Sequence, residues 1–90
     1  MTHEIKILDV FADDVLCGNK TFEIRRNDRG YQKGDHIKFN VVFKDDTHFI
    51  HEIPHKLNRE EYEITYVLSG WGIETGYVAL GIKKIEEAEM

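Results

Sequence analysis

Positively charged side chains gather in one short stretch of this acidic chain. Residues 20–33 carry five lysine or arginine side chains against two acidic ones, whereas the whole chain has a formal net charge of −5. Guanidinium groups donate paired hydrogen bonds to phosphate, and a neighbouring aromatic ring can stack on a nucleobase. The candidate binding side chains in this stretch are Lys20, Glu23, Arg25, Arg26, Asn27, Arg29 and Tyr31. This concentration of charge indicates a local binding site rather than a general aid to solubility.

Two of these residues are also candidates for catalysis. A partly desolvated lysine just after a helix end, such as Lys20, could act as a base or nucleophile, with Glu23 as a proton shuttle or a group that orients water. The alternatives are a solvated Lys20 near the negative end of a helix and an exposed ion pair between Glu23 and Arg25, worth about 0 to 1 kcal/mol. The sequence alone leaves these alternatives open.

A short helix is expected before the basic stretch. Asp9 is typical of a helix N-cap and Gly18 of a left-handed C-cap, so the helix is predicted over about residues 10–17. The single Cys17 cannot form an intramolecular disulfide, and we expect it to be a small buried apolar group.

A strand is expected from Thr21 onward, because polar and apolar residues then alternate. Phe22 and Ile24 are predicted to face the core. The opposite row, predicted to face outward toward the site, is Thr21, Glu23, Arg25 and Asn27. Strict alternation would turn Lys20 toward the core face, so Lys20 either precedes the strand or is re-aimed by a bulge.

The rest of the chain predicts further strands separated by turns. They are expected over residues 3–8, 37–43, 48–53, 62–68 and 77–82, with Gly81 a candidate bulge. Tyr62, Tyr66 and Tyr77 are expected in the core with their hydroxyl groups at the rim. Short connections favour mostly antiparallel pairing. The fold class is therefore predicted as α+β: one domain, residues 1–90, with about six strands in a small barrel and one or two short helices, one of which closes an end.

Trp71 and three histidines complete the list of candidates. Trp71 lies between two glycines, so it is expected either to contact a ligand or to cover the barrel end as part of the core. His48, His51 and His55 are spaced like metal ligands, but residues three apart on a strand face opposite sides. We therefore expect no metal, and surface histidines on a hairpin. Glycine-rich phosphate loops and a G-x-S-x-G elbow are absent, so no nucleotide cofactor is expected.

Composition narrows the possible partners. The net negative charge disfavours indiscriminate attraction to nucleic acid or anionic membranes, which leaves short local contacts. No stretch approaches the roughly 18 apolar residues of a membrane span, and the N-terminus does not resemble a secretory signal. A cytoplasmic protein that does not contact membranes is expected.

The pattern Gly18-x-Lys20-x-x-Glu23-x-Arg25 resembles the G-x-K-x-x-E-x-R motif of the ASCH family, within the PUA-like superfamily. Residues 26–31, 34–35, 64–68 and 76–82 look like a small bacterial and phage branch of uncharacterised single-domain members. This resemblance covers nearly the whole chain. It implies a PUA-like β-barrel with a cleft beside the first helix, lined by the motif residues and proposed to bind RNA.

The resemblance also bears on catalysis. Some similar small proteins are amidohydrolases that act on acetylated cytidine with a lysine at the Lys20 position, a threonine at the Glu23 position and a glutamate elsewhere. This chain has a glutamate in place of the threonine nucleophile. Other relatives are described as ribonucleases.

Three functions are therefore expected as alternatives. The first is a binding module for RNA or a nucleotide-like fragment. Its expected phosphate ligands are Arg25, Arg26 and Arg29, its base-reading residues are Glu23 and Asn27, and its stacking residue is Tyr31 or Trp71. The second is a small hydrolase of a modified nucleoside or RNA that uses Lys20 and Glu23. The third is a protein-interaction domain that uses its sheet edges and acidic surface.

Overall fold

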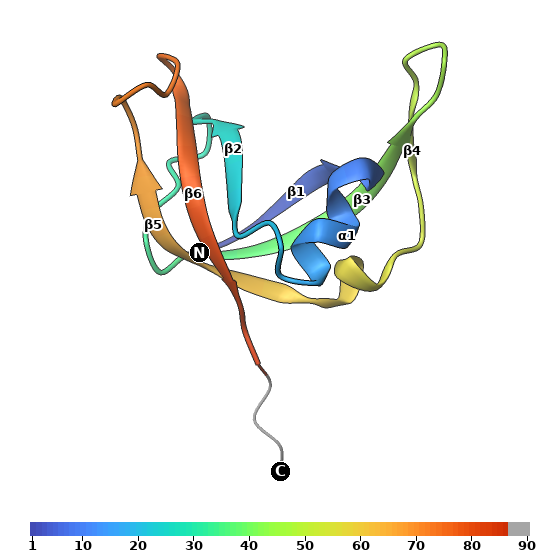
Figure 1. The fold of residues 1–90 in the computed structure, drawn as a ribbon, viewed down its shortest axis with the longest axis horizontal. Helices are drawn as coiled ribbons and strands as arrows, with labels where there is room; N and C mark the ends of the chain where they lie inside the picture. The colour runs from blue at the N-terminus through green and yellow to red at the C-terminus, as the bar shows by residue number, and fades with distance from the viewer. Residues whose placement is uncertain (87–90) are drawn as a thin grey trace.

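The structure, a computed structural model, describes residues 1–86 (Figure 1). Its elements in chain order are β1 (Thr2–Leu8), α1 (Asp9–Leu16), β2 (Phe22–Arg26), β3 (His36–Lys44), β4 (Ile50–Glu52), the short 3-10 helix η1 (Lys56–Arg59), β5 (Glu61–Leu68) and β6 (Tyr77–Lys84). The predicted α+β class, with six strands, is confirmed. No helix within the described range is long and apolar enough to cross a membrane.

The strands form one mixed sheet in the order β1-β3-β5-β6-β2, and β4 pairs with β3 outside this path. β1 and β3 are parallel, and the other pairs are antiparallel. The parallel pair is possible because α1 and β2 lie between β1 and β3 in the chain and provide the long connection that parallel strands require. In Figure 1 the two ends of the sheet, β1 and β2, stand across from each other above α1. A ladder between β1 and β2, which would close a barrel, is absent from the pairings of residues 1–86.

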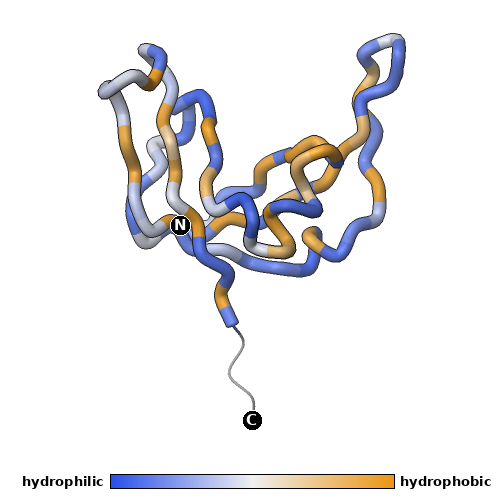
Figure 2. The backbone as a smooth tube through the Cα atoms, viewed as in Figure 1, coloured by the Kyte–Doolittle hydropathy of each residue, from blue (hydrophilic) through white to orange (hydrophobic). Residues whose placement is uncertain are grey.

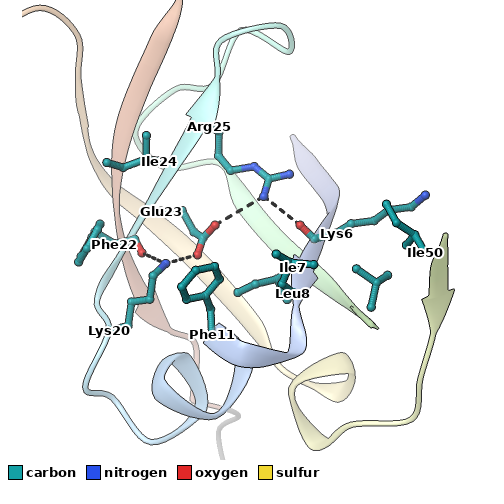
Figure 3. Close-up of a pocket in the computed structure, with 11 residues that line it drawn as sticks. Lys6, Ile7, Leu8, Phe11, Lys20, Phe22, Glu23, Ile24, Arg25 and Ile50 are labelled. Carbon is teal, nitrogen blue, oxygen red and sulfur yellow. Dashed lines mark hydrogen bonds and ion pairs between the residues drawn. The ribbon is translucent and has the colours of Figure 1, made fainter. Parts of the chain in front are cut away.

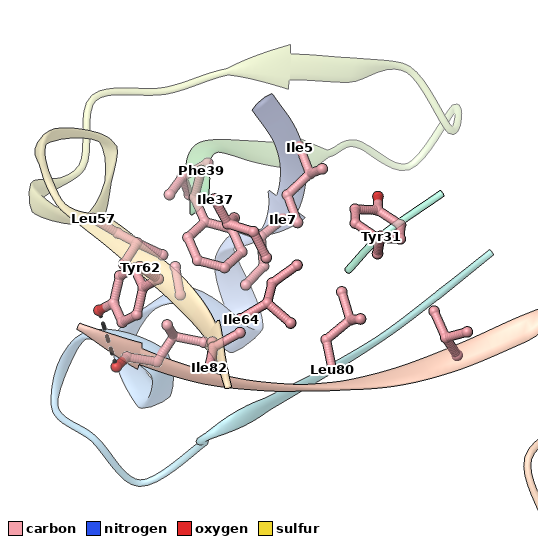
Figure 4. Packing of buried hydrophobic residues seen from close by; sticks show 14 residues of the cluster. Ile5, Ile7, Tyr31, Ile37, Phe39, Leu57, Tyr62, Ile64, Leu80 and Ile82 are labelled. Carbon is pink, nitrogen blue, oxygen red and sulfur yellow. Dashed lines mark hydrogen bonds between the residues drawn. The ribbon is translucent and has the colours of Figure 1, made fainter. Parts of the chain in front are cut away.

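Alternation along β3 provides the middle of the core. Ile37 and Phe39 are fully buried and pack in one apolar cluster with Ile5 and Ile7 of β1 (Figure 4). The Phe39 ring meets the ring of Tyr62, buried as predicted, edge-on at 5.5 Å between centroids. Figure 2 shows the complementary pattern, with hydrophilic residues at the turn between β3 and β4. The predicted period of two is therefore correct from Ile37 to Val41. It fails beyond Val41, because Val42 is also buried and Phe43, predicted in the same row, is 44% exposed.

α1 differs from its predicted form at both ends. Leu8, in an extended conformation, occupies the N-cap position, so the predicted Asp9 cap is wrong and Asp9 lies in the first turn instead. A carboxylate there is still favourable, because the N-terminal end of a helix carries partial positive charge. Cys17 is exposed, so the prediction that it is buried is wrong. The helix buries Ala12 and Val15 and ends at Leu16, and Cys17 is its C-cap residue. Gly18 has φ of 87°, as expected for a left-handed C-cap.

β2 presents the opposite faces to those predicted. Glu23 is 4% exposed, whereas Phe22 and Ile24 are 48% and 52% exposed. The prediction that the two apolar residues face the core is therefore wrong, although Glu23 and Arg25 do share one face. The physical reason is that Lys20 and Arg25 neutralise the buried Glu23 carboxylate. Hydropathy alone therefore did not determine which face of β2 is buried.

β5 changes its facing at a bulge. Ile64 lies opposite Ile82 of β6, but Tyr66 lies opposite Gly81, so Thr65 is an extra residue. Tyr66 is consequently 63% exposed, and its predicted place in the core is wrong. The irregularity expected at Gly81 lies on the partner strand instead. A Cβ atom on Gly81 would come within 2.8 Å of the Thr65 Oγ1 atom, so the glycine accommodates the bulge.

Candidate binding cleft

A cleft of about 530 Å³ opens between β1, β2 and α1 (Figure 3). Its apolar lining residues are Ile7, Leu8, Phe11, Phe22, Ile24, Val42 and Ile50. Its charged lining residues are Lys6, Lys20, Glu23 and Arg25. An apolar cleft of this size with a few convergent polar groups is typical of a site for a small ligand or for one unit of a larger one.

Glu23 lies between two cations. Its Oε1 atom accepts a short hydrogen bond from Lys20 Nζ, and its Oε2 atom lies 3.6 Å from Arg25 Nη1. The Glu23 side chain is 5% exposed, whereas those of Lys20 and Arg25 are 19% and 27% exposed. The cations therefore reach solvent while the carboxylate does not. The three side chains converge on one cavity, whereas Gly18, the fourth motif residue expected there, is not among the residues that line it.

Lys20 precedes β2, which settles its direction. Its Nζ atom donates to the Phe22 carbonyl oxygen at 2.8 Å as well as to Glu23, so the ammonium group folds back over the strand edge. It lies 5.5 Å from the centroid of the Phe11 ring and 4.9 Å from that of Phe22. The ammonium group is thus held by a carboxylate, a carbonyl oxygen and two aromatic rings.

Two arginines bridge the space between β2 and β1. Arg25 Nη1 donates to the Lys6 carbonyl oxygen at 2.9 Å, and Arg29 Nη1 donates to the Glu4 carbonyl oxygen at 2.7 Å. These side chains satisfy carbonyl groups on the edge of β1 that faces away from β3. Arg29, predicted as a phosphate ligand, therefore has a structural contact outside the cleft lining.

Tyr31 cannot serve as the predicted stacking residue. It is 6% exposed and its ring packs against His3, with centroids 4.7 Å apart. His3 in turn hydrogen bonds Asp35 at 2.8 Å, and this contact is the main reason that the pKa of the Asp35 carboxyl lies below its usual value. The prediction failed because Tyr31 lies in a short run of polar residues, which indicated an exposed loop although the tyrosine itself is part of the core.

The other predicted contact residues lie outside the cleft. Arg26 lies over the ring of Tyr77, 6.0 Å from its centroid, and Asn27 is exposed next to the end of β2. Tyr77 is only partly buried. Trp71 is 91% exposed in the loop between β5 and β6, with φ of 53°. The alternative that Trp71 covers the core is therefore wrong.

The three histidines lie at separate places between β3 and η1 and do not converge. His48 lies in the turn before β4, and His51 of β4 hydrogen bonds Asp45 at 2.7 Å. This contact and those from Thr47 hold the pKa of Asp45 well below its usual value. His55 caps η1, where its Nδ1 atom accepts from the Leu57 backbone. Within residues 1–86, no group of three potential metal ligands comes together.

Sequence reasoning missed the walls of the cleft. Leu8 comes from β1, Phe11 from α1 and Ile50 from β4, and none of them carries a polar signature. Nothing in the sequence indicated these residues. Phe11 stands out only in the structure, where this apolar side chain of α1 is half-exposed.

The fold and the cleft define a small α+β domain with a curved six-stranded sheet and a charged, apolar-walled cleft at its open side. A family model described as a domain of unknown function, DUF3850, matches residues 2–82, and the chain belongs to this family. No curated protein matches the chain.

Proposed function

We propose that the cleft binds one base-bearing nucleotide of single-stranded RNA. The observation that carries this proposal is the buried Glu23 carboxylate, which lines an open apolar cleft between two cations. Burying a carboxylate costs stability, and a buried ion pair is seldom the most stable choice for such a position. An apolar cleft that retains this arrangement is suited to a flat ligand with polar edges.

Each part of the cleft has a role in this proposal. A base would lie against Phe11 and the aliphatic walls, with its edge toward Glu23. A carboxylate accepts well from the exocyclic amino group of cytosine, so we expect a preference for cytidine. Arg25 uses one guanidinium donor on the Lys6 carbonyl oxygen, which leaves others for the ligand. Arg26 would meet a phosphate outside the cleft.

The resemblance to the ASCH family supports the same proposal, because it implies RNA binding by the motif residues that converge here. On this view the sheet is a PUA-like barrel whose last joint, between β1 and β2, is made by arginine side chains. A cytoplasmic protein would fit this function.

Fluorescence anisotropy with labelled RNA tests the proposal. We expect fluorescein-labelled octacytidylate to bind more tightly than the corresponding uridine, adenosine and guanosine oligomers at low salt. Glu23→Gln should weaken octacytidylate binding by roughly 5- to 150-fold, the range for loss of a good base contact. The matched control is Asp46→Asn, an exposed carboxylate in the turn between β3 and β4. Equal affinity of the wild type and Glu23→Gln for all four oligomers would refute the proposal.

One contact favours a second candidate function, hydrolysis of an acylated nucleoside. The ammonium group of Lys20 lies within hydrogen-bond reach of Glu23, as acid–base cooperation requires. Water would add to the amide carbonyl and the C–N bond would break, giving a carboxylic acid and the free amine. We expect N4-acetylcytidine to be converted to cytidine by the wild type and by Lys44→Ala, an exposed lysine at the end of β3, but not by Lys20→Ala. Equal product from Lys20→Ala would exclude Lys20 catalysis.

A further inference from the structure

The sheet face of β2, β6 and β5 that points away from the core carries an apolar trough. The register places three residues in each of two successive rows: Phe22, Gly81 and Tyr66, then Ile24, Ala79 and Leu68. The central strand contributes only the small residues, which form a floor. The flanking strands contribute larger side chains, which form two walls; Phe22, Ile24 and Tyr66 are 48%, 52% and 63% exposed, and Leu68 is partly buried.

Positive charge surrounds this trough. Arg26 follows Ile24 on β2 and lies over the Tyr77 ring, and Lys20 Nζ lies 4.9 Å from the centroid of the Phe22 ring at the other end. Lys83 continues the floor strand, opposite Glu63. Three cations thus border an apolar surface in a chain of net charge −5; Lys20 is paired with Glu23, and Lys83 lies opposite Glu63.

We infer that the trough stacks the bases of single-stranded RNA next to the nucleotide held in the cleft. This inference rests on the proposed function and extends its footprint. Neighbouring strands lie about 4.8 Å apart, so the side chains on β2 and β5 begin roughly 10 Å from each other. The Thr65 Oγ1 atom covers Gly81 between them, so a base would stack on the exposed parts of the Phe22 and Tyr66 rings rather than on the strand below. Stacking on aromatic side chains tolerates any base, and nearby cations attract the phosphates.

The strand β2 connects the two sites. Glu23 and Arg25 point into the cleft, whereas the side chains of Phe22 and Ile24, which border the cleft, extend to the other side of β2 (Figure 3). Lys20 sits at the strand edge with contacts to both Glu23 and the Phe22 ring. A polynucleotide that crosses this edge would therefore keep a cation beside its backbone.

Charge favours RNA over a second copy of this chain. A second copy would bring the same cations toward the trough and the same net negative charge to the encounter. A polyanion with flat bases matches both the cations and the aromatic walls.

The test compares a short probe, which can occupy only the cleft, with a long one that can also reach the trough. The probes are cytidine monophosphate, measured by calorimetry, and fluorescein-labelled octacytidylate. We expect Tyr66→Leu to weaken octacytidylate binding by about 5- to 150-fold, as for loss of one stacked base, and to leave the monophosphate affinity unchanged. Tyr66→Phe, which keeps the ring, should bind like the wild type. The matched control is Phe49→Ala, an exposed aromatic residue of the β3–β4 hairpin.

The possible failures are distinguishable. If Tyr66→Leu binds octacytidylate as the wild type does, the trough proposal is overturned, even when Glu23-dependent monophosphate binding upholds the cleft. If the monophosphate does not bind but the octamer binds in a Tyr66-dependent way, the trough stands and the cleft proposal fails. A wild-type dimer in sedimentation velocity that Tyr66→Leu dissociates would overturn the trough proposal, because a second copy would cover the site.

Discussion

Phe39→Ala is expected to lower the free energy of unfolding by about 3–5 kcal/mol, the usual cost of emptying a buried phenylalanine site. Phe39 lies in β3, the strand that contacts β1, β4 and β5, and it is fully buried against Tyr62. A domain of this size is typically stable by about 5–15 kcal/mol. The variant should therefore keep little of its stability. Urea unfolding followed by circular dichroism measures the change.

Phe43→Ala on the same strand is the matched control. Phe43 is 44% exposed and its ring stacks on His51 at 6.3 Å between centroids. We expect a loss of no more than about 1 kcal/mol, as for an exposed aromatic contact. Similar losses at the two positions would mean that the burial pattern along β3 is incorrect.

The double variant Lys20→Met, Arg25→Met is expected to lower the free energy of unfolding by about 3–5 kcal/mol, because it leaves the Glu23 carboxylate buried without a neighbouring cation. Each single variant should lose less, since one cation remains beside Glu23. Because both cations are partly exposed, the converse change, Glu23→Leu alone, should cost less than the double variant.

The triple variant, with Glu23→Leu added to the double, separates stability from function. Replacing a whole buried charge cluster by apolar residues is often neutral or stabilising, so we expect most of the lost stability to return. Octacytidylate binding should not return with it. A triple variant as unstable as the double would instead assign the loss to the missing bond from Arg25 to β1. Urea unfolding and anisotropy on the same samples provide both measurements.

Local pattern predicted the elements better than it predicted their faces. The alternation along β3 was read correctly from Ile37 to Val41, where the apolar residues are buried on one side, as the rule assumes, and it was wrong at Phe43. On β2 the same rule placed Phe22 and Ile24 inward, and it failed because Lys20, outside the strand, compensates Glu23. On β5 the extra Thr65 shifted the facing of Tyr66 by one residue, and a bulge leaves no reliable mark in one sequence.

The candidate site was predictable only in its charged part. Lys20, Glu23 and Arg25 lie within six residues, so one local motif located them. The cleft walls come from β1, α1 and β4, and their approach to β2 depends on the sheet order. The parallel pairing of β1 with β3 determines that order, and no local signal specifies a pairing between strands so far apart in the chain.

The joint between β1 and β2 has an evolutionary consequence. Backbone ladders fix strand separation at one value, whereas the spacing here is spanned by the side chains of Arg25 and Arg29. A change to a shorter side chain at either position would remove one of these bonds to β1 without removing any ladder hydrogen bond. The opening of the proposed binding site can therefore evolve separately from the sheet that carries it.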